Sequence, residues 1–239
     1  MKPIRVLAVD DDPDFQYLLE QTVGSQPDME LVAVCPDGVE ACRAARRHCP
    51  DIVLMDLDLR NAGMDGAEAA RTIRLETAAR VIILTADDDP STVIDASVHA
   101  FASGYVFKSQ FTLLLPTIRE TAAGSTPQSH LICAALLQSL TSAERAVFYS
   151  LLGKDVALHS STKTIANQQT SVLRKLGLPN KQTLRHIFRR IWDNRYDCPV
   201  CSKNCCRRKP FSVHILPRSP GHRYSPNYYR PLCILLRTR

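Results

Sequence analysis

Five short apolar runs, rich in β-branched side chains, recur through the first 120 residues, and the intervals between them leave room for helices. Strands that are apolar at nearly every position are buried on both faces, and strands that alternate with helices pair in parallel with helices on both sides. The fold class predicted is therefore α/β, a doubly wound five-stranded parallel sheet. Its strands are predicted at residues 4–9, 30–34, 51–56, 80–85 and 103–108.

Polar residues that start helices follow several of these runs. Asp37 and Glu40 have the spacing of a capping box, and Asp89 precedes Pro90 as an N-cap residue precedes the first helical position. Asp12 is expected to cap the first helix. These signals predict helices between the strands.

Carboxylates crowd the ends of two strands. Asp10 and Asp11 follow the first strand, and Asp56 ends the third. In an open parallel sheet these two strands flank the switch point, where ligands bind, so the three acids are expected to converge. A hard divalent cation would relieve their repulsion, and Mg²⁺ fits best because it takes oxygen ligands and leaves positions for water and phosphate.

A hydroxyl and an ammonium are predicted at the same edge of the sheet, because Thr85 ends the fourth strand and Lys108 the fifth. With the metal, these groups meet the needs of phosphoryl transfer to a carboxylate: Lys108 neutralises phosphoryl oxygens while Asp56 attacks in line. A single acid at a strand end is more often solvated or a helix cap. Polar residues at the ends of four apolar strands are hard to explain by packing.

Residues 3–122 resemble the receiver domain of two-component response regulators. The resemblance rests on the motifs VDDD, DIVLMDLDL, GMDG, VIILTA and GYVFK, in the family's order and spacing. It implies a flavodoxin-like fold and an acceptor, Asp56, that a sensor histidine kinase phosphorylates. It also implies that Asp11 binds Mg²⁺ directly, that Asp10 binds it through water, and that the main-chain carbonyl of Asp58 completes the protein ligands.

The same resemblance implies a conformational switch. Thr85 is the expected switch hydroxyl, Tyr105 the aromatic residue that moves, and Lys108 the cation that binds the phosphoryl group. A phosphoryl group on Asp56 would attract the Thr85 hydroxyl and vacate space for Tyr105. The affected surface is the fourth helix, fifth strand and fifth helix, where family members commonly dimerise, so a phosphorylation-dependent homodimer is expected.

Charge is divided unevenly along the chain. Residues 1–122 carry 11 Lys and Arg against 20 Asp and Glu, whereas residues 123–192 carry 9 against 2. An acidic surface repels nucleic acid, so DNA binding is expected of the basic part. Four segments are predicted: a receiver domain at 1–122, a linker at 123–139, a helix-turn-helix domain at 140–192 and a largely unfolded basic tail at 193–239.

The third segment resembles the LuxR-type helix-turn-helix (NarL/FixJ-like) of the same regulator class. LTSAERAVF is similar to the first helix of that domain, and STKTIANQQTSVLRKLGLPN to its recognition helix and the turn that follows. The second helix of such a motif enters the major groove, so phosphorylation-gated transcription regulation is implied. Base contacts are expected from Lys163, Thr164, Asn167 and Gln168, and phosphate contacts from Arg174 and Lys175. The alternative is an amphipathic helix with a solvated basic face.

The middle of this segment is shortened. Only seven residues, KDVALHS, separate LLG from STKT, fewer than the family usually has for its scaffold helix and turn. So few residues form barely two helical turns, too short for a stable helix without packing help. A second hypothesis is therefore a phosphorylatable receiver protein that no longer binds specific DNA and acts through protein contacts or as a phosphate sink.

Other classes of protein fit less well. A haloacid-dehalogenase-like phosphatase also uses aspartate and Mg²⁺, but its aspartates belong to a first-strand motif, so a switch protein rather than an enzyme is predicted. A zinc site in the tail is awkward because its cysteines crowd into one short stretch. These are Cys198, Cys201, Cys205 and Cys206. No apolar stretch approaches the roughly 20 residues that cross a bilayer, so a cytoplasmic protein without membrane contact is expected.

Overall fold

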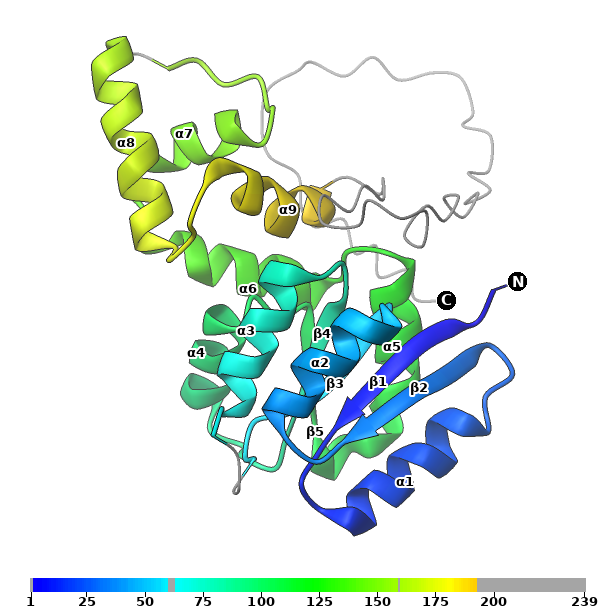
Figure 1. Cartoon of the computed structure of the whole chain (residues 1–239). Coiled ribbons are helices and arrows are strands. Elements are labelled where there is room, and N and C mark those ends of the chain that lie inside the picture. Colours follow the sequence, from blue (N-terminus) through cyan, green and yellow to red (C-terminus); the bar gives the residue numbers. More distant parts are fainter. Residues whose placement is uncertain (1, 60–62, 159, 193–239) are drawn as a thin grey trace, which may run out of the picture.

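Five parallel strands form a single sheet in the order β2-β1-β3-β4-β5 (Figure 1). Every residue of β3 and β4 is buried, as their apolar sequences predict. β1 lies between β2 and β3, so the predicted neighbours at the switch point are adjacent and the α/β fold class is confirmed. The strands are β1 Ile4–Val9, β2 Met29–Cys35, β3 Ile52–Asp56, β4 Arg80–Thr85 and β5 Gly104–Phe107.

The structure is a computed structural model, which describes residues 2–59, 63–158 and 160–192. The predicted tail at 193–239, with the cysteines considered as zinc ligands, lies outside the described residues.

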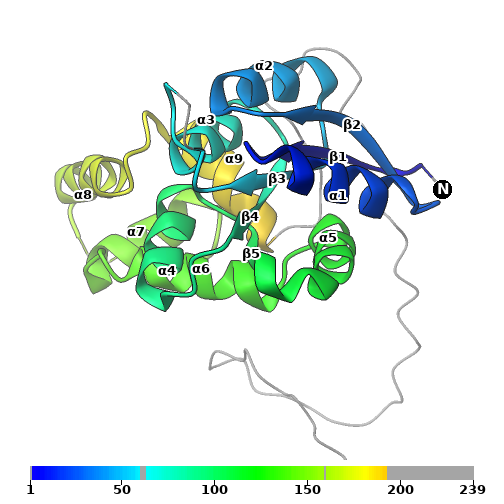
Figure 2. The same cartoon turned by 90° about the horizontal axis from the view of Figure 1, so that it is seen from below.

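Helices cover both faces of the sheet (Figure 2). On one face the strands pack against α1 and α5, through residues such as Leu19 and Ile118. On the other they pack against α2 and α3, through residues such as Ala45 and Ile73. The helices of this domain are α1 Pro13–Gly24, α2 Gly38–His48, α3 Gly66–Glu76, α4 Pro90–His99 and α5 Leu114–Ala123, with a 3-10 helix, η1, at Lys108–Leu113.

The predicted caps start these helices. The side chain of Asp37 accepts a hydrogen bond from the amide of Glu40 at 2.7 Å. Asp89 accepts one from the amide of Thr92 at 2.8 Å, with Pro90 in the first helical turn. Asp12 caps α1. Local sequence thus sets where these helices begin.

Four further helices follow: α6 Pro127–Leu137, α7 Ser142–Leu151, α8 Thr162–Lys175 and α9 Lys181–Trp192. The segment predicted as a linker, 123–139, thus contains a helix. Pro127 begins it rather than preventing it, and Thr126 and Ser129 form a reciprocal capping box at its start. Thr141 and Glu144 form a second reciprocal capping box, which starts α7.

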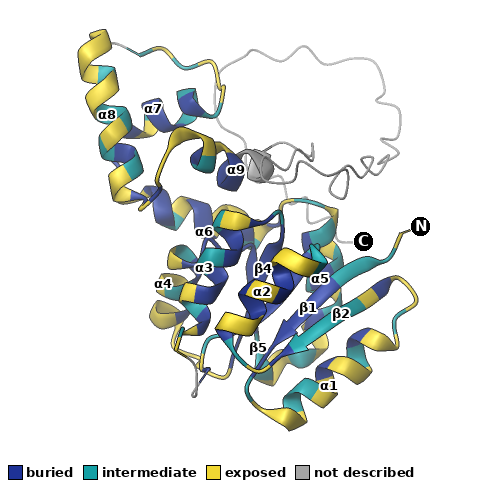
Figure 3. Cartoon of the chain, in the orientation of Figure 1, coloured by how far each residue is buried: buried dark blue, intermediate teal, exposed yellow. Residues whose placement is uncertain are grey.

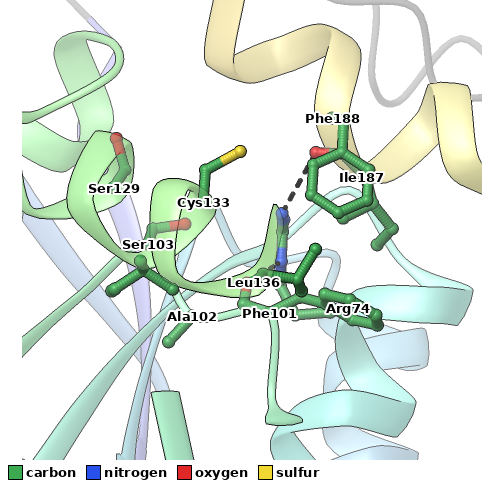
Figure 4. Close-up of a pocket in the computed structure, with 10 residues that line it drawn as sticks. Arg74, Phe101, Ala102, Ser103, Ser129, Cys133, Leu136, Ile187 and Phe188 are labelled. Carbon is green, nitrogen blue, oxygen red and sulfur yellow. Dashed lines mark hydrogen bonds between the residues drawn. The ribbon is translucent and has the colours of Figure 1, made fainter. Parts of the chain in front are cut away.

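A third apolar core joins these helices to the sheet domain. Phe101, which follows α4, packs edge-on against Phe188 of α9 with ring centroids 5.8 Å apart, in a core that includes Leu136 of α6. Arg74 of α3 donates a hydrogen bond to the main-chain carbonyl of Ile187 at 3.5 Å. Figure 4 shows these side chains around a small pocket. The C-terminal helices are therefore docked on the sheet domain.

A second arginine of α3 reaches the end of α8. Arg71 donates hydrogen bonds to the main-chain carbonyls of Leu176 at 3.2 Å and Gly177 at 2.7 Å. Gly177 has a φ of 62°, in the left-handed region that glycine adopts at the ends of helices. A Cβ at Gly177 would lie 2.6 Å from the Arg71 guanidinium, so glycine also permits this close approach.

The segment KDVALHS forms no scaffold helix, since its described residues, 154–158 and 160, are in neither helix nor strand. Within α8 only Val172 is buried, and most of the N-terminal half of this helix is exposed (Figure 3). A helix long and apolar enough for a bilayer does not occur in the described part of the chain.

Gly66 provides a test of how the sheet is packed. A Cβ at this residue would lie 1.9 Å from the main-chain oxygen of Asp56, whereas one at Gly24 would meet nothing within 4 Å. Gly66→Ala must therefore displace the end of β3, and we expect it to lower the free energy of unfolding by about 1–3 kcal/mol. Urea unfolding measures this, with Gly24→Ala as control. Equal stabilities of the two variants would contradict the packing described.

Candidate functional site

Three carboxylates meet where β1 and β3 end. One oxygen from each of Asp10, Asp11 and Asp56 lies within 4.8 Å of the other two. Asp10 is fully buried and Asp56 is 4% exposed. The main chain holds Asp10 in place, because its amide donates to the carbonyl of Cys35 at 3.1 Å. Asp56 is the last residue of β3. The sheet therefore brings together carboxylates that the sequence separates by 46 residues.

An ammonium group bridges two of these acids. Lys108 Nζ lies 2.7 Å from Asp10 Oδ2 and 2.8 Å from Asp56 Oδ2. Burial raises the pKa of Asp10, and the nearby charge of Asp56 adds to this, while the hydrogen bond from Lys108 opposes it. Burial alone would lower the pKa of Lys108, but its hydrogen bonds to Asp10 and Asp56 raise it overall. Lys108 therefore remains a cation between the two acids.

An aromatic pair supports this lysine. Lys108 Nζ lies 4.4 Å from the ring centroid of Phe15 on α1, within range of a cation–π interaction. Phe15 in turn packs edge-on against Phe111, with centroids 5.6 Å apart. Neither Phe15 nor Phe111 was predicted from the sequence to lie at the site. Aromatic residues on helices usually pack in the core, so nothing in the local sequence distinguishes Phe15 from a core residue.

Main-chain and amide groups orient the acids. The amide of Asp12 donates to Asp10 Oδ1 at 3.1 Å, and Gln16 Nε2 donates to the main-chain oxygen of Asp10 at 2.6 Å. The amide of Asp58 donates to Asp56 Oδ1 at 3.3 Å, which places the main chain of Asp58 beside the Asp56 carboxylate. Groups that follow β1 therefore orient Asp10, and the main chain that follows β3 orients Asp56.

The predicted switch residues lie on neighbouring strands. Thr85 is 3% exposed at the end of β4, and its Oγ1 accepts a hydrogen bond from the amide of Asp87 at 3.0 Å. Tyr105 is half-buried on β5, the strand next to β4. Its ring lies edge-on to that of Phe107, with the ring centroids 5.5 Å apart.

The donor set fits a hard divalent cation. Three carboxylates offer oxygen ligands only, and two of them are buried where a charge must be compensated. Mg²⁺ takes such ligands, uses one or two carboxylates and leaves positions for water and phosphate. The cluster of Asp10, Asp11 and Asp56 is therefore chemically suited to Mg²⁺.

Comparison with known proteins identifies the family. The family model of the response regulator receiver domain matches residues 6–118. The chain is 32% identical over 194 residues to the nitrate/nitrite response regulator protein NarP of Escherichia coli (strain K12), which covers 79% of this chain and 89% of NarP. The chain belongs to the two-component response regulators of the NarL and LuxR kind.

Two further similarities lie within this response regulator family. The transcriptional regulatory protein LiaR of Bacillus subtilis (strain 168) is 32% identical over 154 residues, or 63% of this chain and 72% of LiaR. Among solved structures, a two-component response regulator of the LuxR family from Aurantimonas sp. SI85-9A1 is 34% identical and covers 56% of this chain and 97% of that chain, with a TM-score of 0.48.

The predicted DNA-reading residues of the response regulator lie on α8. Lys163, Thr164, Asn167 and Gln168 share one side of its N-terminal half, because residues three and four apart are neighbours on a helix. Gln168 is half-buried and the other three are exposed. The hydroxyl of Thr164 lies 2.9 Å from that of Ser161, which caps the helix.

The two predicted phosphate-contacting residues differ in their surroundings. Arg174 is exposed. Lys175 Nζ lies 2.7 Å from Glu144 Oε2 of α7, so a phosphate contact by Lys175 would compete with this ion pair. Glu144 also accepts hydrogen bonds from Ser171 at 2.7 Å and from the amide of Thr141 at 2.8 Å. This network joins α7 to α8 without a scaffold helix.

The same network predicts a pH dependence of stability. Hydrogen bonds from Lys175, Thr141 and Ser171 lower the pKa of Glu144 from 4.5 to about 2. A depressed folded-state pKa stabilises the protein above the unfolded-state pKa, and this contribution is lost as the pH falls through the folded-state value. We expect the excess stability of the wild type over Glu144→Gln to be constant above about pH 4.5 and to shrink toward pH 2.

Urea unfolding across this pH range measures the difference. Asp155→Asn, which removes an exposed carboxylate in the loop after α7, is the matched control and should show no comparable dependence. A difference for Glu144→Gln that does not change with pH would contradict the network.

Proposed function

We propose that this response regulator accepts a phosphoryl group on Asp56 from a sensor histidine kinase, and that phosphorylation gates dimerisation and DNA binding to regulate transcription. The observation that carries the proposal is the position of Lys108 Nζ, at 2.7 and 2.8 Å from Asp10 and Asp56 inside a buried acidic cluster. A cation held at an otherwise repulsive site is suited to bind the oxygens of an incoming phosphoryl group.

The chemistry follows from the side chains present. A carboxylate oxygen of Asp56 attacks phosphorus in line, while the bond from phosphorus to the imidazole nitrogen of the kinase breaks and its electron pair stays on that nitrogen. Lys108 exchanges its contact with Asp56 for a contact with a phosphoryl oxygen. Asp10, Asp11, Asp56 and the carbonyl of Asp58 would hold Mg²⁺, which when bound would neutralise charge on the phosphoryl oxygens. The phosphoryl group stays on the protein's own aspartate, so the protein acts as a switch rather than as an enzyme that turns over a substrate.

The switch acts through Thr85 and Tyr105. A phosphoryl group on Asp56 offers acceptors to the Thr85 hydroxyl, which would give up its contact with the amide of Asp87. Movement of Thr85 leaves space on the β5 side, into which Tyr105 turns. The face formed by α4, β5 and α5 is thereby altered, and we assign homodimerisation to it.

DNA binding is assigned to the C-terminal helices. Residues 1–122 form the receiver domain, 123–139 the connection, and 140–192 the output domain in this proposal. The support is the exposed N-terminal half of α8 and its polar face, together with the relatives, which include a transcriptional regulatory protein. A regulator of this kind works on DNA in the cytoplasm.

A second candidate function follows from one observation, the absence of helix in the described residues of KDVALHS. A helix-turn-helix uses its first helix to cross the DNA backbone and orient the second. Without it, the protein would be a phosphorylatable receiver that acts through protein contacts or as a phosphate sink.

Selection of genomic DNA fragments separates the two functions. Full-length protein is used with and without the phosphoryl mimic beryllofluoride and Mg²⁺, at near-physiological salt. We expect enrichment of a sequence with two half-sites that strengthens with the mimic, because dimerisation presents two copies of α8. Asp56→Asn, which keeps the shape of the acceptor without its charge, should abolish the response. Sequence-independent retention that vanishes with salt and ignores the mimic would instead support the second candidate.

A further inference from the structure

Helix α6 lies on the face to which the switch is assigned. It packs against α4 and against β5, the edge strand of the sheet (Figure 1). Ile132 shares a buried core with Ala100 and Ala102, which precede β5. Cys133 shares another with Phe101. The connection between the two domains therefore covers part of the surface that a dimer would use.

One side chain of α6 completes the edge of the sheet. Gln128 Oε1 accepts a hydrogen bond from the amide of Tyr105 at 3.2 Å, and Gln128 Nε2 donates one to the carbonyl of Tyr105 at 3.2 Å. Its amide thus pairs with the outward-facing groups of β5 as a neighbouring strand would. A Cβ at residue 104 would lie 2.6 Å from Gln128 Oε1, so Gly104 permits this approach.

The chain before α6 is also fixed to the sheet domain. Arg80, at the start of β4, donates hydrogen bonds to the carbonyls of Thr121 and of Gly124, the latter at 2.7 Å. The hydroxyl of Thr126 donates to the carbonyl of Ser103 at 3.3 Å, and this contact is buried. These contacts before Gln128, together with the packing of Ile132 and Cys133 after it, hold Gln128 against β5.

We propose that α6 is an intramolecular ligand of the α4–β5 face, and that Gln128 couples its docking to the position of Tyr105. The side-chain amide of Gln128 binds the main chain of Tyr105, the residue that the switch would move. A displacement of the Tyr105 main chain therefore weakens both hydrogen bonds together. Phosphorylation then releases α6 and with it the helices that follow.

The occupant that replaces α6 is a second copy of this chain. Release uncovers the apolar residues Ala100, Phe101 and Ala102 and leaves the amide and carbonyl of Tyr105 unpaired at a strand edge. Such an edge and such a patch favour association with another protein surface. In the proposed function the α4–β5–α5 face meets its own copy, so docking of α6 and dimerisation exclude each other.

The inference rests on the proposed phosphorylation of Asp56, and its first test needs no variant. Hydrogen exchange at the Tyr105 amide is followed by NMR in the full-length protein, with and without beryllofluoride and Mg²⁺. Release of Gln128 predicts exchange faster by about 10-fold or more with the mimic bound, because the amide loses its acceptor. Unchanged exchange at Tyr105, while amides around Asp56 respond to the mimic, would overturn the inference alone.

A variant tests the reciprocal effect that linkage requires. Gln128→Ala removes both hydrogen bonds. Release of α6 then costs less free energy, so beryllofluoride binds with a more favourable free energy. Its affinity should rise about 3- to 10-fold, and dimers should form at lower protein concentration in sedimentation experiments. His130→Ala, at an exposed position of the same helix, should match the wild type.

The outcomes distinguish this inference from the function on which it rests. Equal beryllofluoride affinities of the wild type, Gln128→Ala and His130→Ala would overturn the coupling and leave phosphorylation of Asp56 standing. A wild-type protein that binds no beryllofluoride in the presence of Mg²⁺ would contradict the proposed function, and the inference with it.

Discussion

A lysine ammonium held between two buried carboxylates is the interaction on which the rest of this structure depends. Asp10 and Asp56 are almost fully buried, and carboxylates removed from water are costly unless a cation or hydrogen bonds compensate them. Lys108 supplies that compensation at 2.7 and 2.8 Å. The three residues come from the ends of β1, β3 and β5, so the ion pairs form only when the parallel sheet has assembled in its observed order.

In our proposal the same arrangement makes the site respond to phosphorylation of Asp56. Lys108 neutralises charge on both acids, and in the proposed function it binds the phosphoryl group on Asp56. The strands that carry Asp56, Thr85 and Tyr105 are neighbours in the sheet, and the switch that we propose runs across them in this order. Tyr105 is hydrogen-bonded to Gln128, so in our proposal the signal from Asp56 reaches the C-terminal helices through the edge of the sheet.

Helix α8, to which we assign DNA binding, depends on its neighbours more than the second helix of a complete helix-turn-helix would. Helix α8 has one fully buried residue, Val172, and it is held near its C-terminal end by Lys175 through Glu144. Arg71 of the receiver domain places a positive charge at that end, where the helix dipole is negative. Contacts from α7 and α3 thus take over part of the positioning that a scaffold helix provides in such motifs.

Local signals explain why so much of the fold could be predicted from the sequence. The strands are mostly apolar, and Asp37, Asp89 and Thr141 are caps whose partners lie within three residues. The rule for ligand sites in parallel sheets was enough to bring Asp10 and Asp56 together. Features formed by distant residues could not be predicted in this way. Phe15 beneath Lys108 and Arg71 at the end of α8 depend on packing between elements far apart in the chain.

Helix α6 shows a different limit. Gly124, Pro127 and the polar residues around them are typical of a linker, but the same residue types also start helices. Which occurs here depends on a buried face, of which Ile132 and Leu136 are part, and that face is stable only against the sheet domain and α9. The sequence contained the apolar residues without indicating what they would pack against.

The most direct test of the account is the site of phosphorylation itself. Full-length protein is incubated with acetyl phosphate and Mg²⁺, the acyl phosphate is reduced with borohydride, and the modified residue is located by mass spectrometry. We expect modification at Asp56 alone, dependent on Mg²⁺ and lost in Asp56→Asn. Modification at another carboxylate, or none at all in the folded protein, would contradict it.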